Sequence, residues 1–158
     1  MNRIATHGPL SQTRLRRVVT DLAAREQQWL NLVRYTEESR WYQRLARADD
    51  YEVWLLSWLP GQGTGFHDHG GSSGAFTVTQ GALQELTAPD GRPNPVAATM
   101  TQGAARSFGP WYVHHVINAS AQPAVSVHAY SPPLPRMTRY DLTPAGLVLR
   151  DTVGAAAW

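Results

Sequence analysis

The sequence predicts an all-β domain, either a barrel or a sandwich, that follows a helical segment at the N-terminal end. Beyond residue 50, short runs of β-branched, aromatic and leucine residues alternate with turns that contain Gly or Pro. Before residue 50, apolar residues recur at helical spacing. A length of 158 residues suits one domain with its own core. We therefore expect residues 1–158 to form a single domain, with helices over about 1–48 and a barrel over about 51–152.

The N-terminal segment 11–33 is predicted to be helical, in one or two pieces. Leu15, Val18, Val19 and Leu22 are spaced by three and four residues or lie side by side, which places them on one helix face, and Ser11 is a suitable N-cap. A second short helix is predicted over residues 37–47. After it, the pattern changes to β-type runs.

The strand prediction begins with residues 51–59, YEVWLLSWL, which are almost continuously apolar and end at a Pro-Gly pair. Such a run indicates a strand that is buried on both faces. Further strands are expected at residues 65–69, 75–80, 83–87, 105–108, 113–118, 124–130, 138–142 and 147–152. The turn-rich PDGRPNP segment at 89–95 should link the two halves of the barrel over the surface.

Composition excludes several classes of protein. The net charge of +2 builds no strong positive field, so no nucleic-acid partner is expected. No apolar run is long enough to suggest a membrane span, and the first residues lack the pattern of a secretory signal. We expect a cytoplasmic protein with no membrane and no obligate protein partner. Because the chain has no cysteine, any metal must be held by histidine, carboxylate or carbonyl groups.

His67 and His69 are the first candidate ligands. They stand two residues apart in GFHDH, so on a strand both rings project from one face and Asp68 points to the other. Two imidazoles on one face of a strand can bind one metal ion.

Their surroundings resemble the first motif of the cupin superfamily. Gly61, His67, His69 and Gly81 have the spacing of that motif, whereas the place of its usual glutamate holds Gly74. A second motif is matched by Gly103, His114 and Asn118, although two intermediate places differ.

The paired motifs imply one cupin barrel, that is, a double-stranded β-helix or jelly roll. They also select His114 as the third ligand and leave its neighbour His115 facing away from the metal. Without the glutamate, three neutral imidazoles would leave a divalent metal with its full charge and open coordination positions. A thiolate suits such a site, and O2 chemistry beside it requires a redox-active metal such as Fe(II) rather than zinc.

The chain resembles the cysteine dioxygenase family over most of residues 40–135. The resemblance is carried by WLPGQGTGFHDHGGSSGAF, by HHVINASAQPAVSVHAYSPPL, and most specifically by AVSVHAYSPPL within the latter. Ser126, His128 and Tyr130 alternate there, so their side chains share one strand face. The resemblance implies that the hydroxyl of Tyr130 approaches substrate and oxygen, while the other two residues fix its position. Many members cross-link this tyrosine to a cysteine, but Gly74 stands at the corresponding place here.

The substrate implied by the resemblance is L-cysteine, converted with O2 into cysteine sulfinic acid. In family members that act on cysteine, an Arg that follows a Tyr-x pair binds the carboxylate, and Tyr42 and Arg44 in RWYQRL fit that spacing. The alternative substrate is 3-mercaptopropionate or another small thiol, since a one-residue slip would place Gln43 at the arginine position. More distant alternatives are a cupin isomerase or decarboxylase with another metal, and a non-catalytic cupin that only binds a small ligand.

Overall fold

The computed structural model describes residues 8–154, and the remaining residues of the predicted domain, 1–7 and 155–158, lie outside the described residues. None of the helices in the described part is long and apolar enough to cross a membrane. The elements in chain order are α1 (Gln12–Ala23), the short 3₁₀ helices η1 (Glu26–Gln28) and η2 (Leu30–Leu32), β1 (Trp41–Arg47), β2 (Glu52–Trp58), β3 (Phe66–His67), β4 (Ser73–Gln80), β5 (Ala82–Thr87), η3 (Pro89–Gly91), β6 (Val96–Thr101), β7 (Ala105–Phe108), β8 (His114–Ile117), β9 (Ala124–Ser131), β10 (Arg136–Thr143) and β11 (Gly146–Gly154).

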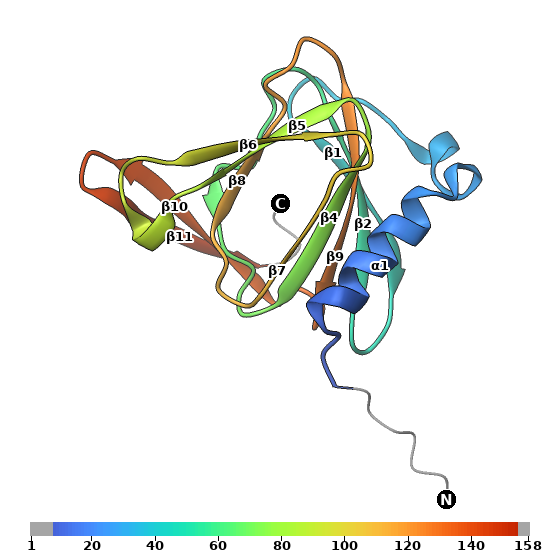
Figure 1. The fold of residues 1–158 in the computed structure, drawn as a ribbon, viewed down its shortest axis with the longest axis horizontal. Coiled ribbons are helices and arrows are strands. Elements are labelled where there is room, and N and C mark those ends of the chain that lie inside the picture. The colour runs from blue at the N-terminus through green and yellow to red at the C-terminus, as the bar shows by residue number, and fades with distance from the viewer. Residues whose placement is uncertain (1–7, 155–158) are drawn as a thin grey trace, which may run out of the picture.

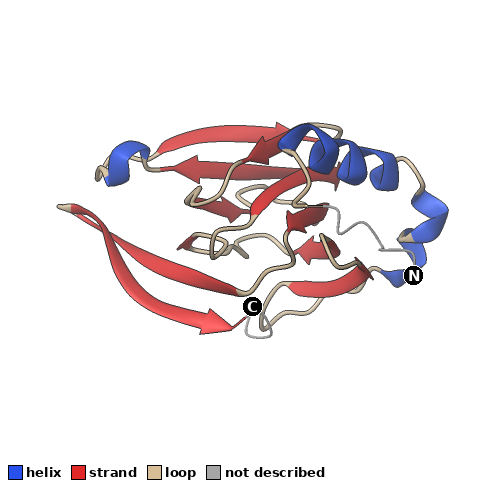
Figure 2. Ribbon diagram, turned by 90° about the horizontal axis from the view of Figure 1, so that it is seen from below, coloured by secondary structure: helices blue, strands red, loops and turns tan. Residues whose placement is uncertain are grey.

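Two antiparallel sheets face each other and give the chain a cupin fold, as expected. One sheet has the strand order β1-β2-β9-β4-β7, and the other has the order β11-β10-β3-β8-β5-β6. Figure 1 shows them as opposite walls, with α1 on the outer side of β4 and β9. In the side view of Figure 2, the β10–β11 hairpin reaches beyond the rest of its sheet.

The central strands β2, β4 and β9 of the five-stranded sheet are buried on both faces, because α1 covers the face that points away from the other sheet, whereas the edge strand β1 is largely exposed. On β2, Trp54, Leu56 and Trp58 join the core between the sheets, whereas Val53 and Leu55 pack in the layer beneath α1. This double burial explains the continuous apolar run of residues 51–59. It confirms the expected strand there, and each of the other predicted strands also overlaps an observed one.

The helix predicted over residues 37–47 is wrong, because residues 41–47 form β1. This strand pairs antiparallel with β2, with Tyr42 opposite Leu56 and Arg44 opposite Trp54. Backbone pairing along the open edge of β2 outweighs the helix propensity of Gln, Arg, Leu and Ala in this segment.

Two further features differ from the sequence expectation, the extent of the N-terminal helix and the presence of one additional strand. The helix expected at residues 11–33 consists of α1, capped by Ser11, followed by the turns η1 and η2. The strand β6 was not predicted, because its small and mostly exposed residues give little β signal.

Hydrogen bonds of Asp68 connect the end of the short strand β3 to β10. Its backbone N–H donates to the carbonyl of Thr138, and its buried carboxylate accepts from the Thr138 N–H at 3.2 Å, the Gly70 N–H at 3.0 Å and the Tyr140 hydroxyl at 2.8 Å. Asp68 therefore faces away from the two histidines that flank it, as its place in the sequence predicts. Burial and the hydrogen bond to Asp68 raise the pKa of Tyr140 to about 12, so this donor keeps its proton.

Replacing Asp68 by Ala should lower the free energy of unfolding by roughly 2–4 kcal/mol, because several buried donors lose one acceptor. Tyr140→Phe removes only one of these bonds and should cost about 1 kcal/mol. Urea denaturation of both variants measures the difference. Equal losses in the two variants would show that the carboxylate does not hold β3 in place.

Candidate metal centre

Three histidines meet between the sheets. His67 on β3 lies directly opposite His114 on β8, and His69 follows β3 by two residues. All three are buried, and one ring nitrogen of each lies within 4.8 Å of the others. The structure thus brings together the residues that the two sequence motifs select, and they form a group able to hold a metal ion.

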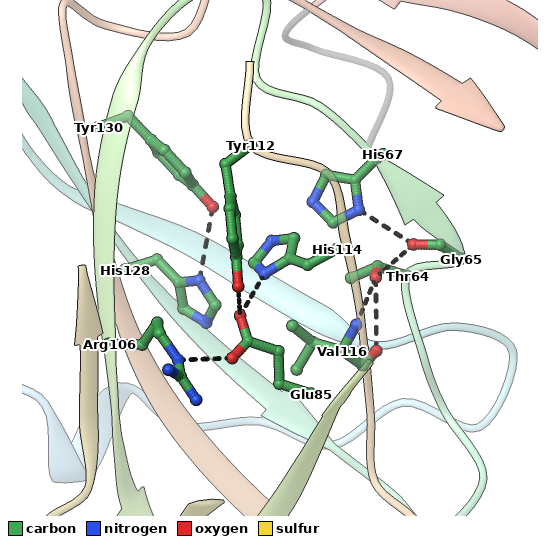
Figure 3. Close-up of polar contacts among 10 residues, drawn as sticks. All are labelled: Thr64, Gly65, His67, Glu85, Arg106, Tyr112, His114, Val116, His128 and Tyr130. Atoms are coloured by element: carbon green, nitrogen blue, oxygen red, sulfur yellow. Dashed lines mark hydrogen bonds and ion pairs between the residues drawn. The ribbon is translucent and has the colours of Figure 1, made fainter. Parts of the chain in front are cut away.

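The hydrogen bonds of these histidines leave the remaining nitrogens available to a metal. Nδ1 of His67 lies 3.0 Å from the Gly65 carbonyl, and Nδ1 of His114 lies 2.9 Å from Oε1 of Glu85 (Figure 3). Both acceptors require a proton on Nδ1, so Nε2 carries a lone pair in each ring. In His69, both ring nitrogens are buried and neither makes a good hydrogen bond within the described residues. Such buried, unsatisfied nitrogens fit a metal ion as their partner.

Burial also keeps the rings of His67 and His69 neutral. Desolvation, together with the nearby ring of His114, lowers the pKa of His67 well below its usual value. Desolvation and the nearby His67 and His114 do the same for the pKa of His69. Neutral imidazole is the form that binds metals, so the site is ready for a cation near neutral pH.

A cavity of about 210 Å³ opens beside the histidines. Its wall contains two of the three clustered histidines, another histidine and a tyrosine from β9, two arginines and several apolar side chains. The lining residues are Arg40, Leu56, Thr64, His67, His114, Val116, His128, Tyr130, Met137 and Arg139. This volume suits a small molecule that lies against the metal group.

Ser126, His128 and Tyr130 form a connected chain along the inner face of β9. The Trp58 indole N–H donates to the Ser126 hydroxyl at 2.9 Å, and that hydroxyl can then donate to Nε2 of His128 at 2.8 Å. Nδ1 of His128 carries the proton in this arrangement and lies 3.4 Å from the Tyr130 hydroxyl (Figure 3). The Tyr130 oxygen is thus the acceptor in this contact, which does not use the proton of the phenol.

The pKa values of His128 and Tyr130 keep both side chains uncharged near neutral pH. Burial raises the pKa of Tyr130, and Arg40 opposes that shift only in part. Burial, with smaller effects from His114 and Arg40, lowers the pKa of His128 to about 3. The phenol is therefore a proton donor near neutral pH and not a phenolate.

Gly74 lies opposite Tyr130 and Phe108 on neighbouring strands. A Cβ atom at Gly74 would clash with the Phe108 ring and approach Cδ1 of Tyr130 to 3.1 Å. The ring of Phe108 thus fills the space where a side chain at residue 74 would stand. It also stacks on His69, with ring centroids 4.7 Å apart.

The expected carboxylate-binding pair, Tyr42 and Arg44, is placed elsewhere. The described residues that line the cavity include neither of them. Arg44 is 46% exposed, lies 3.8 Å from the carboxylate of Glu52 and covers the ring of Trp54. Tyr42 packs edge-on against the same tryptophan ring.

Arg40, which directly precedes β1, is the arginine of this segment that reaches the cavity. Its guanidinium covers the Trp58 ring and donates to the Gly63 carbonyl at 3.2 Å, while its buried Nε has no hydrogen-bond partner among the described residues. Burial lowers the pKa of Arg40, and the nearby Tyr130 opposes that shift. A half-buried guanidinium with an unpartnered Nε at the wall of a cavity is able to bind an anion.

Sequence reasoning missed Arg40 and Glu85, although each carries a signal. Arg40 shares the strand phase of Tyr42 and Arg44, which becomes visible once residues 41–47 are read as a strand. Glu85 lies in phase with the buried Leu83 on β5, and an acidic residue at an inward position suggests a buried partner. Trp58, which joins the core between the sheets, also donates its indole N–H to Ser126.

The chain matches the model of one protein family and is similar in structure to several solved proteins. The model of the family described as Cysteine dioxygenase type I matches residues 13–143. TT1209 from Thermus thermophilus is 24% identical, with a TM-score of 0.58 over 66% of this chain and 93% of that chain. A protein with a double-stranded β-helix domain from Klebsiella pneumoniae is 20% identical, with a TM-score of 0.57 over 77% and 92% of the two chains. A cupin superfamily protein from Desulfitobacterium hafniense is 12% identical, with a TM-score of 0.55 over 65% and 86%. These likenesses support the fold, and no curated protein matches the chain.

Replacing His114 by Ala should abolish stoichiometric binding of a divalent metal such as Co(II), whereas His115→Ala should leave it intact. His115 packs its ring edge-on against Phe66 on the other side of β8 and is the matched control. Metal content after anaerobic loading and desalting measures both variants. Retention of metal by the His114 variant would contradict the ligand assignment.

In the metal-free protein, His128 should make stability fall as the pH falls. The unfolded chain takes up this proton near the ordinary pKa of 6.5, whereas the folded protein takes it up only at about 3. Between these values the unfolded state binds more protons, so acidification from pH 7.5 to 5 costs about 2 kcal/mol through this group. His128→Gln should reduce the total loss by that amount in urea titrations at the two pH values. The same loss in both proteins would refute the assignment.

Proposed function

Since this chain belongs to the cysteine dioxygenase type I family, we propose that it is an Fe(II)-dependent thiol dioxygenase that converts L-cysteine and O2 into cysteine sulfinic acid. The observation that carries the proposal is a cavity lined by His67 and His114, two of the three buried histidines of the metal group, and by Arg40, whose Nε has no hydrogen-bond partner among the described residues. One end of this cavity suits a metal-bound sulfur and the other a carboxylate. In the overall reaction both oxygen atoms go to sulfur, and the electrons that sulfur loses reduce O2, so no separate reductant is needed.

His67, His69 and His114 would hold the metal. When bound there, Fe(II) would supply coordination of the thiol sulfur and activation of O2. The protein contributes neutral ligands, and their lack of charge favours an anionic substrate.

Arg40, in place of Arg44, would bind the substrate carboxylate. It lines the cavity together with His67 and Tyr130, whereas Arg44 and Arg47 lie 3.8 and 3.5 Å from the buried carboxylate of Glu52. A guanidinium that forms two parallel hydrogen bonds would orient the substrate with its thiol toward the histidines.

Tyr130 would donate a hydrogen bond to substrate or oxygen in the cavity. His128 and Ser126 would fix the direction of its hydroxyl, and Trp58 would fix Ser126. The raised pKa of Tyr130 keeps its proton in place for this role.

A second candidate substrate, 3-mercaptopropionate, is favoured by one observation. The described lining of the cavity includes two arginines but no Asp or Glu that could bind an α-ammonium group. A thiol carboxylate without an amine would therefore leave no cationic group unpaired.

The test is O2 uptake and sulfinate formation by the Fe(II)-loaded protein, with L-cysteine and 3-mercaptopropionate compared in parallel. We expect turnover with at least one of them. Absence of uptake with both thiols, in protein that retains its iron, would favour a non-catalytic cupin or one with another metal and reaction.

Arg40→Gln should raise the KM for the better thiol by roughly 10- to 150-fold, because a charge-assisted hydrogen bond worth about 1.5–3 kcal/mol is lost. Arg44→Gln is the matched control and should change KM by less than about threefold, because Arg44 is not among the described residues that line the cavity. The opposite ranking of the two variants would return the carboxylate to Arg44.

A further inference from the structure

Glu85 is a buried carboxylate behind the metal group, outside the substrate cavity. Its side chain is 1% exposed and comes from β5, the strand beside β8. Oε1 accepts hydrogen bonds from Nδ1 of His114 and from the Tyr112 hydroxyl, each at 2.9 Å. Oε2 lies 2.6 Å from Nε of Arg106. Figure 3 shows all three partners converging on this one carboxylate.

We infer that Glu85 is a positioning residue that makes His114 the strongest donor to the metal. Its carboxylate holds the His114 proton on Nδ1, which directs the Nε2 lone pair to the metal group. It also places a negative charge one imidazole ring away from the cation, which raises the basicity of the ligand. The inference rests on the metal site of the proposed function and not on its thiol chemistry.

The three histidines differ in this respect. His114 donates to a charged carboxylate, His67 donates to the neutral carbonyl of Gly65, and the nitrogens of His69 make no good hydrogen bond in the described structure. A charged acceptor gives a hydrogen bond about twice as strong as a neutral one. The three ligands are therefore unequal, with His114 supported best.

The charge balance of Glu85 suits this role. Oε2 lies 2.6 Å from Nε of Arg106, whose guanidinium is always charged, and this close cation favours the ionised carboxylate. The group is an anion, and Arg106 offsets the cost of burying it. The carboxylate that is missing at residue 74 among the ligands is thus present one layer behind them.

A purely structural role is the competing explanation, because Glu85 also joins β5 to Tyr112 and Arg106. Tyr112→Phe separates the two roles. It removes one hydrogen bond to the carboxylate while keeping the ring that stacks on Phe108, and it leaves the bond from His114 to Glu85 intact.

The experiment titrates Co(II) into metal-free wild type, Glu85→Gln and Tyr112→Phe, and follows the visible absorption of bound Co(II). Glu85→Gln keeps an acceptor for His114 but removes the charge, and it should weaken Co(II) binding by roughly 10- to 100-fold and shift the absorption bands. Tyr112→Phe should weaken binding by less than about threefold and leave the bands in place, because the charged acceptor of His114 remains. Equal affinity and spectra in wild type and Glu85→Gln, or equal weakening in both variants, would overturn the inference.

A measurement on the wild type covers the case in which Glu85→Gln does not fold. Two-bond ¹H–¹⁵N spectra of the metal-free protein should show His114 protonated on Nδ1, and a proton on Nε2 would refute the inference. Co(II) binding that depends on Glu85 without O2 uptake on any thiol would uphold the inference and reject the proposed reaction. Failure of wild type to bind Co(II) would reject the metal site itself.

Discussion

The pairing of His67 with His114 across β3 and β8 is the contact on which the rest of the site depends. Because β3 is very short, its register is held from outside by β10 and by the bonds of Asp68. On the other side of β8, pairing with β5 brings Glu85 behind His114. A shift of one residue in β8 would turn His115 inward and remove both the metal group and its carboxylate support.

The second constraint is charge. The cavity wall contains neutral imidazoles and the guanidinium of Arg40, whose Nε lacks a partner in the described part of the chain, while the nearby carboxylates Glu85 and Glu52 are already engaged with arginines. Burying a cation in this way is unfavourable until an anion arrives. The protein gives up part of its folding stability for an interior that is complementary to a negatively charged ligand, which is a common feature of binding sites.

Most strands of the two-sheet cupin fold and the histidine group could be predicted from the sequence, because apolar runs and fixed motif spacing are local signals. β1 could not, since RWYQRLAR is rich in helix formers and its pairing with β2 is a tertiary effect. The helix expected over residues 37–47 also affects the spacing of Arg40 and Arg44. Four residues span about 13 Å on a strand but about 6 Å on a helix, and among the described residues Arg40 lines the cavity and Arg44 does not. The contact of Glu85 with His114 depends on strand order, which the local pattern does not encode.

The close fit of Phe108 over Gly74 couples these two positions, because a side chain added at residue 74 would occupy the space of the phenylalanine ring. A side chain cannot enter at residue 74 while the phenylalanine ring fills the space, so position 108 must first become smaller. That step would remove the ring that stacks on His69 and Tyr112 and leave a void in the core. A protein with the smaller residue 108 and Gly74 unchanged is therefore less stable than the present one, and the two positions depend on each other through the space that they share.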